Sequence, residues 1–114
     1  MSRSPITTHI LDTAKGLPAA NVPVKMFKLV DDQWLFLTDG LTDADGRIAN
    51  WLMPLTEVEF ATYKLTFDLD AYFTDSDKPA FYPLAEICFR VQDTKHHHIP
   101  LLLSPFGYST YRGS

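Results

Sequence analysis

The feature that most constrains the fold is a repeated alternation of apolar and polar residues over short runs. In Tyr63–Leu69 every second residue is apolar, and a period of two places alternate side chains on opposite faces of a strand. Turn-forming residues, among eight prolines and five glycines, separate such runs. The pattern predicts about eight strands: Ile6–Leu11, Asn21–Val30, Trp34–Thr38, Ile48–Leu52, Glu57–Leu69, Ala85–Val91, His96–Leu103 and Phe106–Tyr111.

One segment, Asp70–Asp75, does not alternate and predicts one or two helical turns. About eight short strands with one brief helix indicate an all-β fold, a two-sheet antiparallel β-sandwich. The alternation also predicts which side chains face the core. These are Val22, Val24 and Met26, then Tyr63, Leu65, Phe67 and Leu69, then Ile87, Phe89 and Val91.

Asp39–Gly46 is predicted as a loop that ends in a tight Asp-Gly turn with positive φ at the glycine. It resembles part of a calcium-binding loop, but leucines (Leu41 and Leu52) occupy the positions that need an acidic residue and a glutamate. An ordinary turn is therefore favoured. Arg47 follows this turn at the base of a short strand. An arginine there is either a bidentate anion ligand or a surface residue.

Length and charge limit the function classes. A chain of 114 residues with 46 % hydrophobic residues is expected to form one domain over residues 1–114. A net charge of −4 and a pI near 5.4 argue against nucleic acid or anionic membrane as the main partner. We find no export signal and no apolar run long enough to span a membrane. We therefore expect a cytoplasmic protein, with the peroxisome or periplasm left open for a chain trimmed of a leader.

Nucleophilic side chains are few and lack their usual partners. Cys88 is the only cysteine, and without a basic neighbour it is interpreted as a buried structural residue. Ser109 and Ser114 lie in no Gly-x-Ser-x-Gly elbow. A covalent serine or thiol mechanism is therefore disfavoured.

The four histidines allow three interpretations. They are His9 and the consecutive His96, His97 and His98. In an extended strand His96 and His98 share one face, and His97 takes the other. Two imidazoles on one face suit acid–base work near neutral pH. A metal site lacks enough further ligands, and a solvated histidine-rich edge is the third alternative.

Three blocks together carry a resemblance to one family. They are Thr8-His9-Ile10-Leu11-Asp12 with Gly16-x-Pro18-Ala19, then Thr42-Asp43-Ala44-Asp45-Gly46-Arg47, then the tail His96–Ser114 ending in Tyr-Arg-Gly-Ser. Over nearly its whole length the chain resembles the 5-hydroxyisourate hydrolases, the transthyretin-related enzymes of urate breakdown. The resemblance implies a transthyretin-like homotetramer, with active sites in a channel where two dimers meet. It implies hydrolysis without metal or cofactor.

The resemblance also implies the site residues. His9, Arg47, His98 and Ser114 are the expected catalytic residues, and His9, Arg47 and Tyr111 are expected to bind substrate. The two imidazoles would handle the water and the proton, in an order that the sequence leaves open. Arg47 would hold a carbonyl or its oxyanion, and Tyr111 would hydrogen-bond to the ring or stack on it. Ser114, by hydroxyl or carboxylate, would orient a histidine or the water.

The implied reaction is hydrolysis of a cyclic C–N bond in 5-hydroxyisourate, which gives 2-oxo-4-hydroxy-4-carboxy-5-ureidoimidazoline. One departure from the family is His97, where many members carry tyrosine. Because His97 falls on the face opposite His98, we expect it to be neutral for activity. The alternative is a transthyretin-like carrier that binds an aromatic ligand in the tetramer channel. That carrier has lysine at the position of His9 and lacks the Tyr-Arg-Gly-Ser end.

Overall fold

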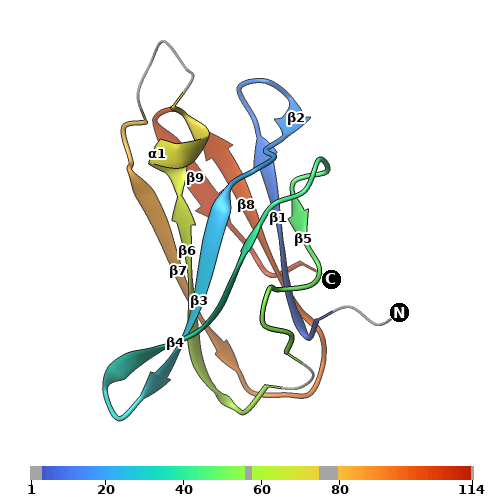
Figure 1. Cartoon of the computed structure of the whole chain (residues 1–114), viewed down its shortest axis with the longest axis vertical. Coiled ribbons are helices and arrows are strands. Elements are labelled where there is room, and N and C mark those ends of the chain that lie inside the picture. Colours follow the sequence, from blue (N-terminus) through green and yellow to red (C-terminus); the bar gives the residue numbers. More distant parts are fainter. Residues whose placement is uncertain (1–3, 56–57, 75–79, 114) are drawn as a thin grey trace.

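The chain folds into two β-sheets that face each other, with one short helix at one end (Figure 1). The computed structural model describes residues 4–55, 58–74 and 80–113. Within these residues there are nine strands, of which two span only two residues each. The predicted all-β sandwich with one short helix is confirmed.

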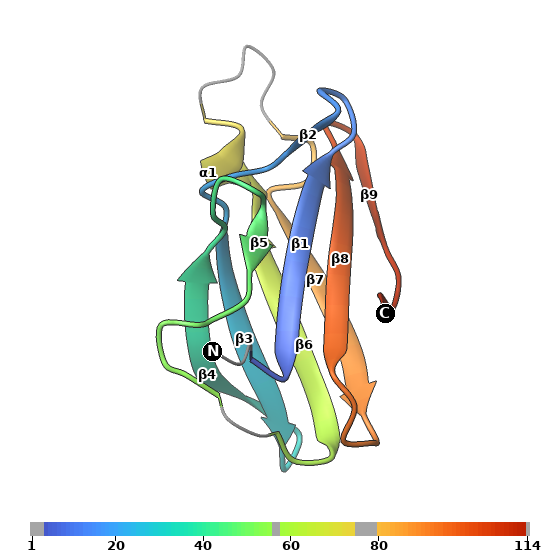
Figure 2. The ribbon, with the colours of Figure 1, turned by 90° about the vertical axis from the view of Figure 1, so that its right-hand side faces the viewer.

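The first sheet has the order β2–β1–β8–β9, and β5 pairs with β1 on the same side as β2. Its strands are β1 (Ile6–Asp12), β2 (Leu17–Pro18), β5 (Arg47–Ile48), β8 (His97–Ser104) and β9 (Gly107–Thr110). The pair β1–β8 is parallel, which departs from a fully antiparallel arrangement. A parallel pair needs a long connection between its strands, and here the whole second sheet lies between β1 and β8 in the chain (Figure 2).

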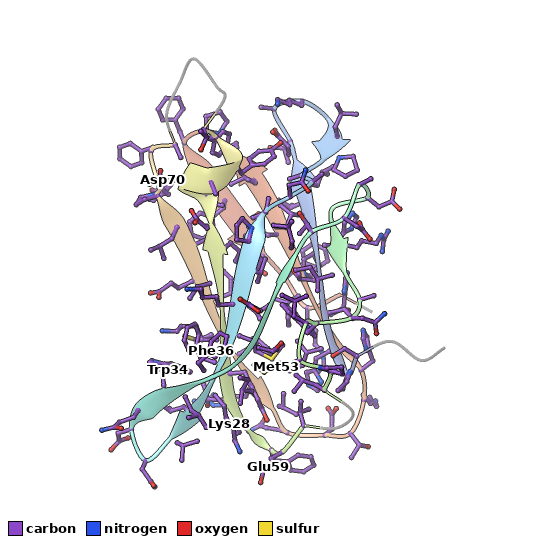
Figure 3. All side chains as sticks on the ribbon, in the orientation of Figure 1. Lys28, Trp34, Phe36, Met53, Glu59 and Asp70 are labelled. Carbon is purple, nitrogen blue, oxygen red and sulfur yellow. The ribbon has the colours of Figure 1, made fainter. Side chains whose placement is uncertain are left out.

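The second sheet has the order β4–β3–β6–β7, and all its pairs are antiparallel. Its strands are β3 (Pro23–Val30), β4 (Gln33–Leu41), β6 (Ala61–Asp68) and β7 (Leu84–Val91). On its outer surface the Lys64 ammonium lies 4.5 Å from the centre of the Trp34 ring. Trp34 and Phe36 lie on the β4 strand of the β3–β4 hairpin, near the Lys28–Glu59 ion pair (Figure 3).

Strand β4 is longer than the sequence predicts. Asp39–Leu41 was expected in a loop, but it pairs with Pro23–Lys25 of β3. Gly40, a residue that normally weakens a strand, allows a close approach here. A Cβ at position 40 would lie 3.2 Å from the Ile48 side chain and 3.3 Å from the Trp51 ring. Gly40 therefore lies within the strand, where it permits close packing, and the loop begins at Thr42.

The predicted strand Ile48–Leu52 is wrong beyond its first residue. Only Arg47 and Ile48 pair with β1, and the chain then turns to bury the Trp51 ring. The Trp51 indole N–H donates a hydrogen bond of 2.8 Å to the carbonyl of Ile6. Because the Trp51 ring is buried, the chain leaves the sheet after Ile48, and β5 contains only Arg47 and Ile48.

The predicted core faces are largely confirmed. Val22, Val24 and Met26 are fully buried, as are Tyr63, Leu65 and Phe67. Leu69 is also buried, but it is the first residue of α1 (Leu69–Tyr72) rather than the end of a strand. The Asp68 carboxylate caps this helix by accepting a hydrogen bond of 3.0 Å from the Ala71 N–H.

Cys88 is exposed, so its interpretation as a buried cysteine is wrong. It belongs to the edge strand β7, where Ala85 and Val91 are buried and Ile87 and Phe89 are half-buried. Cys88 alternates with these residues and therefore takes the outer face. No helix in the described parts of the chain is long and apolar enough to cross a membrane.

Candidate active site

The candidate site lies on the outer face of the first sheet, the face directed away from the second sheet. Along β1 the side chains of Ile6, Thr8 and Ile10 are buried in the core. The intervening residues Thr7 and His9 therefore take the outer face. Figure 1 shows β5 and β8 on the two sides of β1. Side chains from three strands thus meet on one surface.

Arg47 is placed beside His9 by strand pairing. β5 runs antiparallel to β1, and Arg47 is the direct partner of His9 in the register. Directly opposed residues have side chains on the same face, within reach of each other. Arg47 is exposed and His9 is half-buried, so a guanidinium and an imidazole lie side by side facing solvent.

His98 reaches the same surface from β8. Its partner in the parallel register is Thr7, and His9 pairs with Pro100. The ring centres of His9 and His98 lie 6.5 Å apart, with an angle of 30° between their planes. A water molecule or a small planar ligand can contact both rings at that separation. One chain therefore brings His9, Arg47 and His98 together.

The tail returns along β8 to reach His98. In the β8–β9 pair Leu101 faces Thr110, and three residues further along each segment His98 faces Gly113. The Gly113 N–H donates a hydrogen bond of 2.9 Å to the His98 carbonyl. A Cβ at position 113 would come within 2.6 Å of the His98 ring carbon Cδ2. Glycine is what lets the tail lie directly against this histidine.

The loop before Arg47 is built around Asp43. Its carboxylate accepts hydrogen bonds from the backbone N–H groups of Asp45, at 2.9 Å, and Arg47, at 3.0 Å. Gly46 has φ +74°, as the predicted Asp-Gly turn requires. A Cβ there would also lie 2.4 Å from the carbonyl oxygen of Ile10, so the loop packs directly on β1. These contacts fix where Arg47 begins its strand.

The surroundings of His9 favour its neutral form. Partial burial lowers the pKa of His9 below its ordinary value, and the nearby positive charge of Arg47 lowers it further. A hydrogen bond to the backbone of Asp45 and the charges of Asp43 and Asp45 act in the opposite direction without cancelling the decrease. His9 is therefore mainly neutral at pH 7 and able to accept a proton.

Thr7 joins two histidines and is a residue that the sequence reasoning missed. Its hydroxyl lies 2.8 Å from Nδ1 of His98 and 2.9 Å from Nε2 of His96. The two histidine rings stack with centres 6.4 Å apart. The alternation of β1 already places Thr7 on the face of His9, but only the β1–β8 register shows that it lies opposite His98.

Tyr111 lies away from the paired imidazoles, in the lining of a pocket of about 230 Å³ between β7, β8 and the tail. His97 lines the same pocket and is buried, with no hydrogen-bond partner for its Nδ1 among the described residues. The carboxylate of Asp93 lies 4.0 Å from the His97 ring and 3.8 Å from the Arg112 guanidinium. His97 thus takes the face opposite His98, as predicted.

The role expected of Ser114 and the absence of a metal are both implied by the resemblance. Ser114 lies outside the described residues, so its expected role stays a prediction. Within the described ranges no group of three or more His, Cys, Asp or Glu side chains is placed to hold a metal ion.

The chain is similar to known proteins over nearly its whole length. The model of the HIUase/Transthyretin family matches residues 6–113. The 5-hydroxyisourate hydrolase of Mus musculus is 43 % identical over 114 residues, which cover 97 % of this chain and 96 % of the relative.

Two solved structures are similar in fold. The 5-hydroxyisourate hydrolase of Klebsiella pneumoniae has a TM-score of 0.83 and 34 % identity, with 100 % of each chain covered. Sea bream transthyretin in complex with thyroxine has a TM-score of 0.87 and 35 % identity, with 96 % of this chain and 94 % of that chain covered. A family model that spans nearly the whole chain and relatives this similar lead to one conclusion: the chain belongs to the HIUase/Transthyretin family.

Proposed function

We propose that this chain hydrolyses 5-hydroxyisourate and releases 2-oxo-4-hydroxy-4-carboxy-5-ureidoimidazoline. The observation that carries the proposal is the convergence of His9, Arg47 and His98 on one face of a single sheet, with the tail lying against His98. It is supported by several curated relatives named 5-hydroxyisourate hydrolase, among them the mouse protein at 43 % identity.

His9 is the general base in the proposed mechanism, because burial and Arg47 keep its pKa low and its ring neutral. It takes a proton from water as the oxygen of that water bonds to a ring carbonyl carbon. His98, as an imidazolium, then gives a proton to the ring nitrogen while the C–N bond breaks. One water is consumed, and the ring opens to a carboxylate after loss of a proton.

Arg47 stabilises the negative charge that develops on the carbonyl oxygen. Its guanidinium offers two parallel N–H donors, and strand pairing holds it beside the base. One preorganised donor at such an oxyanion contributes about 3 kcal/mol to lowering the barrier. Its exposed position leaves the head group accessible to substrate.

Two further residues complete the proposed site. Tyr111 is exposed but lines the pocket on the His97 side, so it would hydrogen-bond to the substrate ring or stack on it only after its side chain turns toward the outer face. Ser114 follows Gly113 directly, which lies against His98, so it would orient that imidazole or the water.

We further propose a homotetramer in which the outer face of the first sheet lines a channel between two dimers. In a single chain this face is open, and His9 and His98 are only half-buried. Covering the face would exclude water and strengthen the electrostatic interactions among these side chains.

The test is the ultraviolet decay of freshly prepared 5-hydroxyisourate with and without the protein. We expect accelerated decay, and its loss in His9→Ala, Arg47→Ala and His98→Ala. His97→Ala is the matched control, because this neighbouring histidine takes the opposite face. Three alanine variants that each retain full acceleration would contradict the assigned residues.

The tail is tested separately by deleting Gly113 and Ser114. We expect a folded tetramer, by light scattering, with little activity. Full activity in the shortened chain would refute the role of the tail.

A second candidate function is transport of an aromatic ligand, favoured by the similarity to the transthyretin that was solved in complex with thyroxine. Fold similarity alone does not separate the two, since the TM-scores are 0.87 and 0.83. The discriminating measurement is calorimetric titration with thyroxine. Tight binding of thyroxine by a protein that does not accelerate decay would favour the carrier.

A further inference from the structure

We propose that Thr7 and His96 are positioning residues that hold His98 in its Nδ1–H tautomer, so that Nε2 exchanges the proton in the reaction. This inference rests on the proposed function, because it assigns the nitrogen of His98 that takes part in hydrolysis. Its structural basis is the contact of one threonine hydroxyl with two imidazoles, at 2.8 Å and 2.9 Å.

The single hydrogen of the Thr7 hydroxyl limits how this group can hydrogen-bond to the two imidazoles. A hydroxyl has one hydrogen to donate, and its oxygen accepts through its lone pairs. It can therefore donate to Nδ1 of His98 or to Nε2 of His96, but not to both. Whichever nitrogen does not receive this hydrogen must carry its own if the contact is a hydrogen bond. The protonation states of the two rings are coupled through Thr7.

The catalytic cycle selects between these arrangements. His98 must be an imidazolium in at least one step, whether it gives a proton or takes one. Both of its nitrogens then carry hydrogen, so the Thr7 oxygen accepts from Nδ1–H and the Thr7 hydrogen points to His96. Because this network can persist when Nε2 loses its proton, neutral His98 is left as the Nδ1–H tautomer.

The opposite arrangement would impair the reaction. If Thr7 donated to Nδ1, neutral His98 would carry its hydrogen on Nε2. Protonating that ring would then require the Thr7 hydroxyl to rotate, and its new donor direction would need an acceptor at His96. Partners of this kind fix histidine tautomers in many active sites.

The local geometry supports a positioning role. Thr7 is buried, with 4 % of its surface exposed, and strand pairing places it directly opposite His98. The rings of His96 and His98 are nearly parallel, at 20°. A buried hydroxyl between two strands has little freedom to choose other partners, so the direction of its hydrogen bond favours one tautomer of His98.

The experiment measures the tautomer directly, by long-range ¹H–¹⁵N correlation spectra of the full-length protein labelled at histidine nitrogens. The His98 signals are assigned with His98→Asn. In the wild type we expect neutral His98 to carry hydrogen on Nδ1. In Thr7→Val, which keeps the shape and removes the hydroxyl, we expect the Nε2–H form to become dominant.

Activity gives the second readout. We expect Thr7→Val to lower kcat about tenfold or more with little change in KM, since the substrate contacts remain. Thr7→Ser keeps a hydroxyl and is expected to restore both the tautomer and most of kcat. His96→Phe should reproduce the tautomer change, because it removes the acceptor for the Thr7 hydrogen.

Thr8→Val is the matched control. The Thr8 hydroxyl donates to the Ile99 carbonyl at 2.6 Å and joins the same two strands, β1 and β8, on the core side. Its loss should lower stability and leave the His98 tautomer unchanged. This separates a specific effect on His98 from general loosening of the strand pair.

Two results for His98 would contradict the proposed role of Thr7. Neutral His98 with its hydrogen on Nε2 in the wild type would refute it, and so would Thr7→Val with an unchanged tautomer. A protein that shows the Thr7-dependent tautomer but does not hydrolyse 5-hydroxyisourate would overturn the proposed function, while the structural effect of Thr7 on His98 would stand.

Discussion

Gly113 lies directly against His98. Its N–H donates a hydrogen bond of 2.9 Å to the His98 carbonyl, and a Cβ at position 113 would come within 2.6 Å of the His98 ring. Real Cβ atoms do not approach so closely, so the ring or the tail must shift if a side chain is added. The position of the imidazole therefore depends on the absence of a side chain in the tail.

Gly113→Ala should displace the His98 ring with little effect on folding, because position 113 lies beyond β9 in an isolated bridge to His98. We expect kcat to fall about tenfold or more, since misplacing a catalytic group by about 1 Å can lower the rate about 100-fold. The melting temperature should change little. Gly107→Ala is the control, because its Cβ would meet only the Ser104 hydroxyl, at 3.7 Å. Equal activity in both variants would contradict the prediction.

Replacing Arg47 should change the pKa of His9 in a defined direction. The guanidinium charge lowers that pKa, so Arg47→Ala should raise it, and a smaller fraction of His9 should be neutral near pH 6.5. In the wild-type protein the acidic limb of the kcat/KM profile should follow the lowered pKa of His9. Arg47→Lys keeps the charge and should keep the pKa low, while losing the planar fork that holds the oxyanion. NMR titration of His9 measures the pKa, and a decrease in Arg47→Ala would show that the sign is wrong.

Two glycines with similar backbone angles should respond differently to alanine. Gly16 has φ +68° and nothing within 4 Å of a new Cβ, whereas Gly46 has φ +74° and the Ile10 carbonyl oxygen at 2.4 Å. Gly16→Ala should cost about 1 kcal/mol of stability for the left-handed conformation alone. Gly46→Ala adds a clash with backbone and should cost about 3 kcal/mol or more. Urea denaturation measures both, and equal costs would mean that the loop moves away from β1 without penalty.

His97→Phe should stabilise the protein and spare its activity. Nδ1 of His97 is buried without a hydrogen-bond partner in the described part of the chain, and such a group costs about 1–3 kcal/mol. The neighbouring pocket of about 230 Å³ leaves room for the larger ring. We expect a gain of about 1 kcal/mol in the free energy of unfolding. The acceleration of 5-hydroxyisourate decay by the protein should be unchanged. A loss of activity would show that His97 takes part in the site after all.

Local patterns predicted most of the strands because burial follows alternation directly. Val22, Val24 and Met26 point into the core as expected, and His97 and His98 take opposite faces. The errors arose where contacts with residues distant in the sequence determine the local structure. Trp51 pulls its segment off the sheet to reach the carbonyl of Ile6, and nothing within the predicted strand Ile48–Leu52 signals that contact.

The candidate site was predictable in its residue types but not in its full set of contacts. His9, Arg47 and His98 came from the resemblance to a family, and the structure places them together. Thr7 was missed because its position opposite His98 depends on a parallel register between strands about 90 residues apart. No local spacing encodes such a register, since side-chain alternation is the same for parallel and antiparallel neighbours.

The parallel pairing of β1 with β8 also delays completion of the first sheet while the chain is synthesised. The strands of the second sheet, β3, β4, β6 and β7, have all been synthesised before β8 emerges. β1, which carries His9, is made before these strands, yet its partner β8 is made after them. The nascent chain therefore holds β1 without its β8 neighbour until the second sheet has been synthesised, and His9 and His98 can meet only after that.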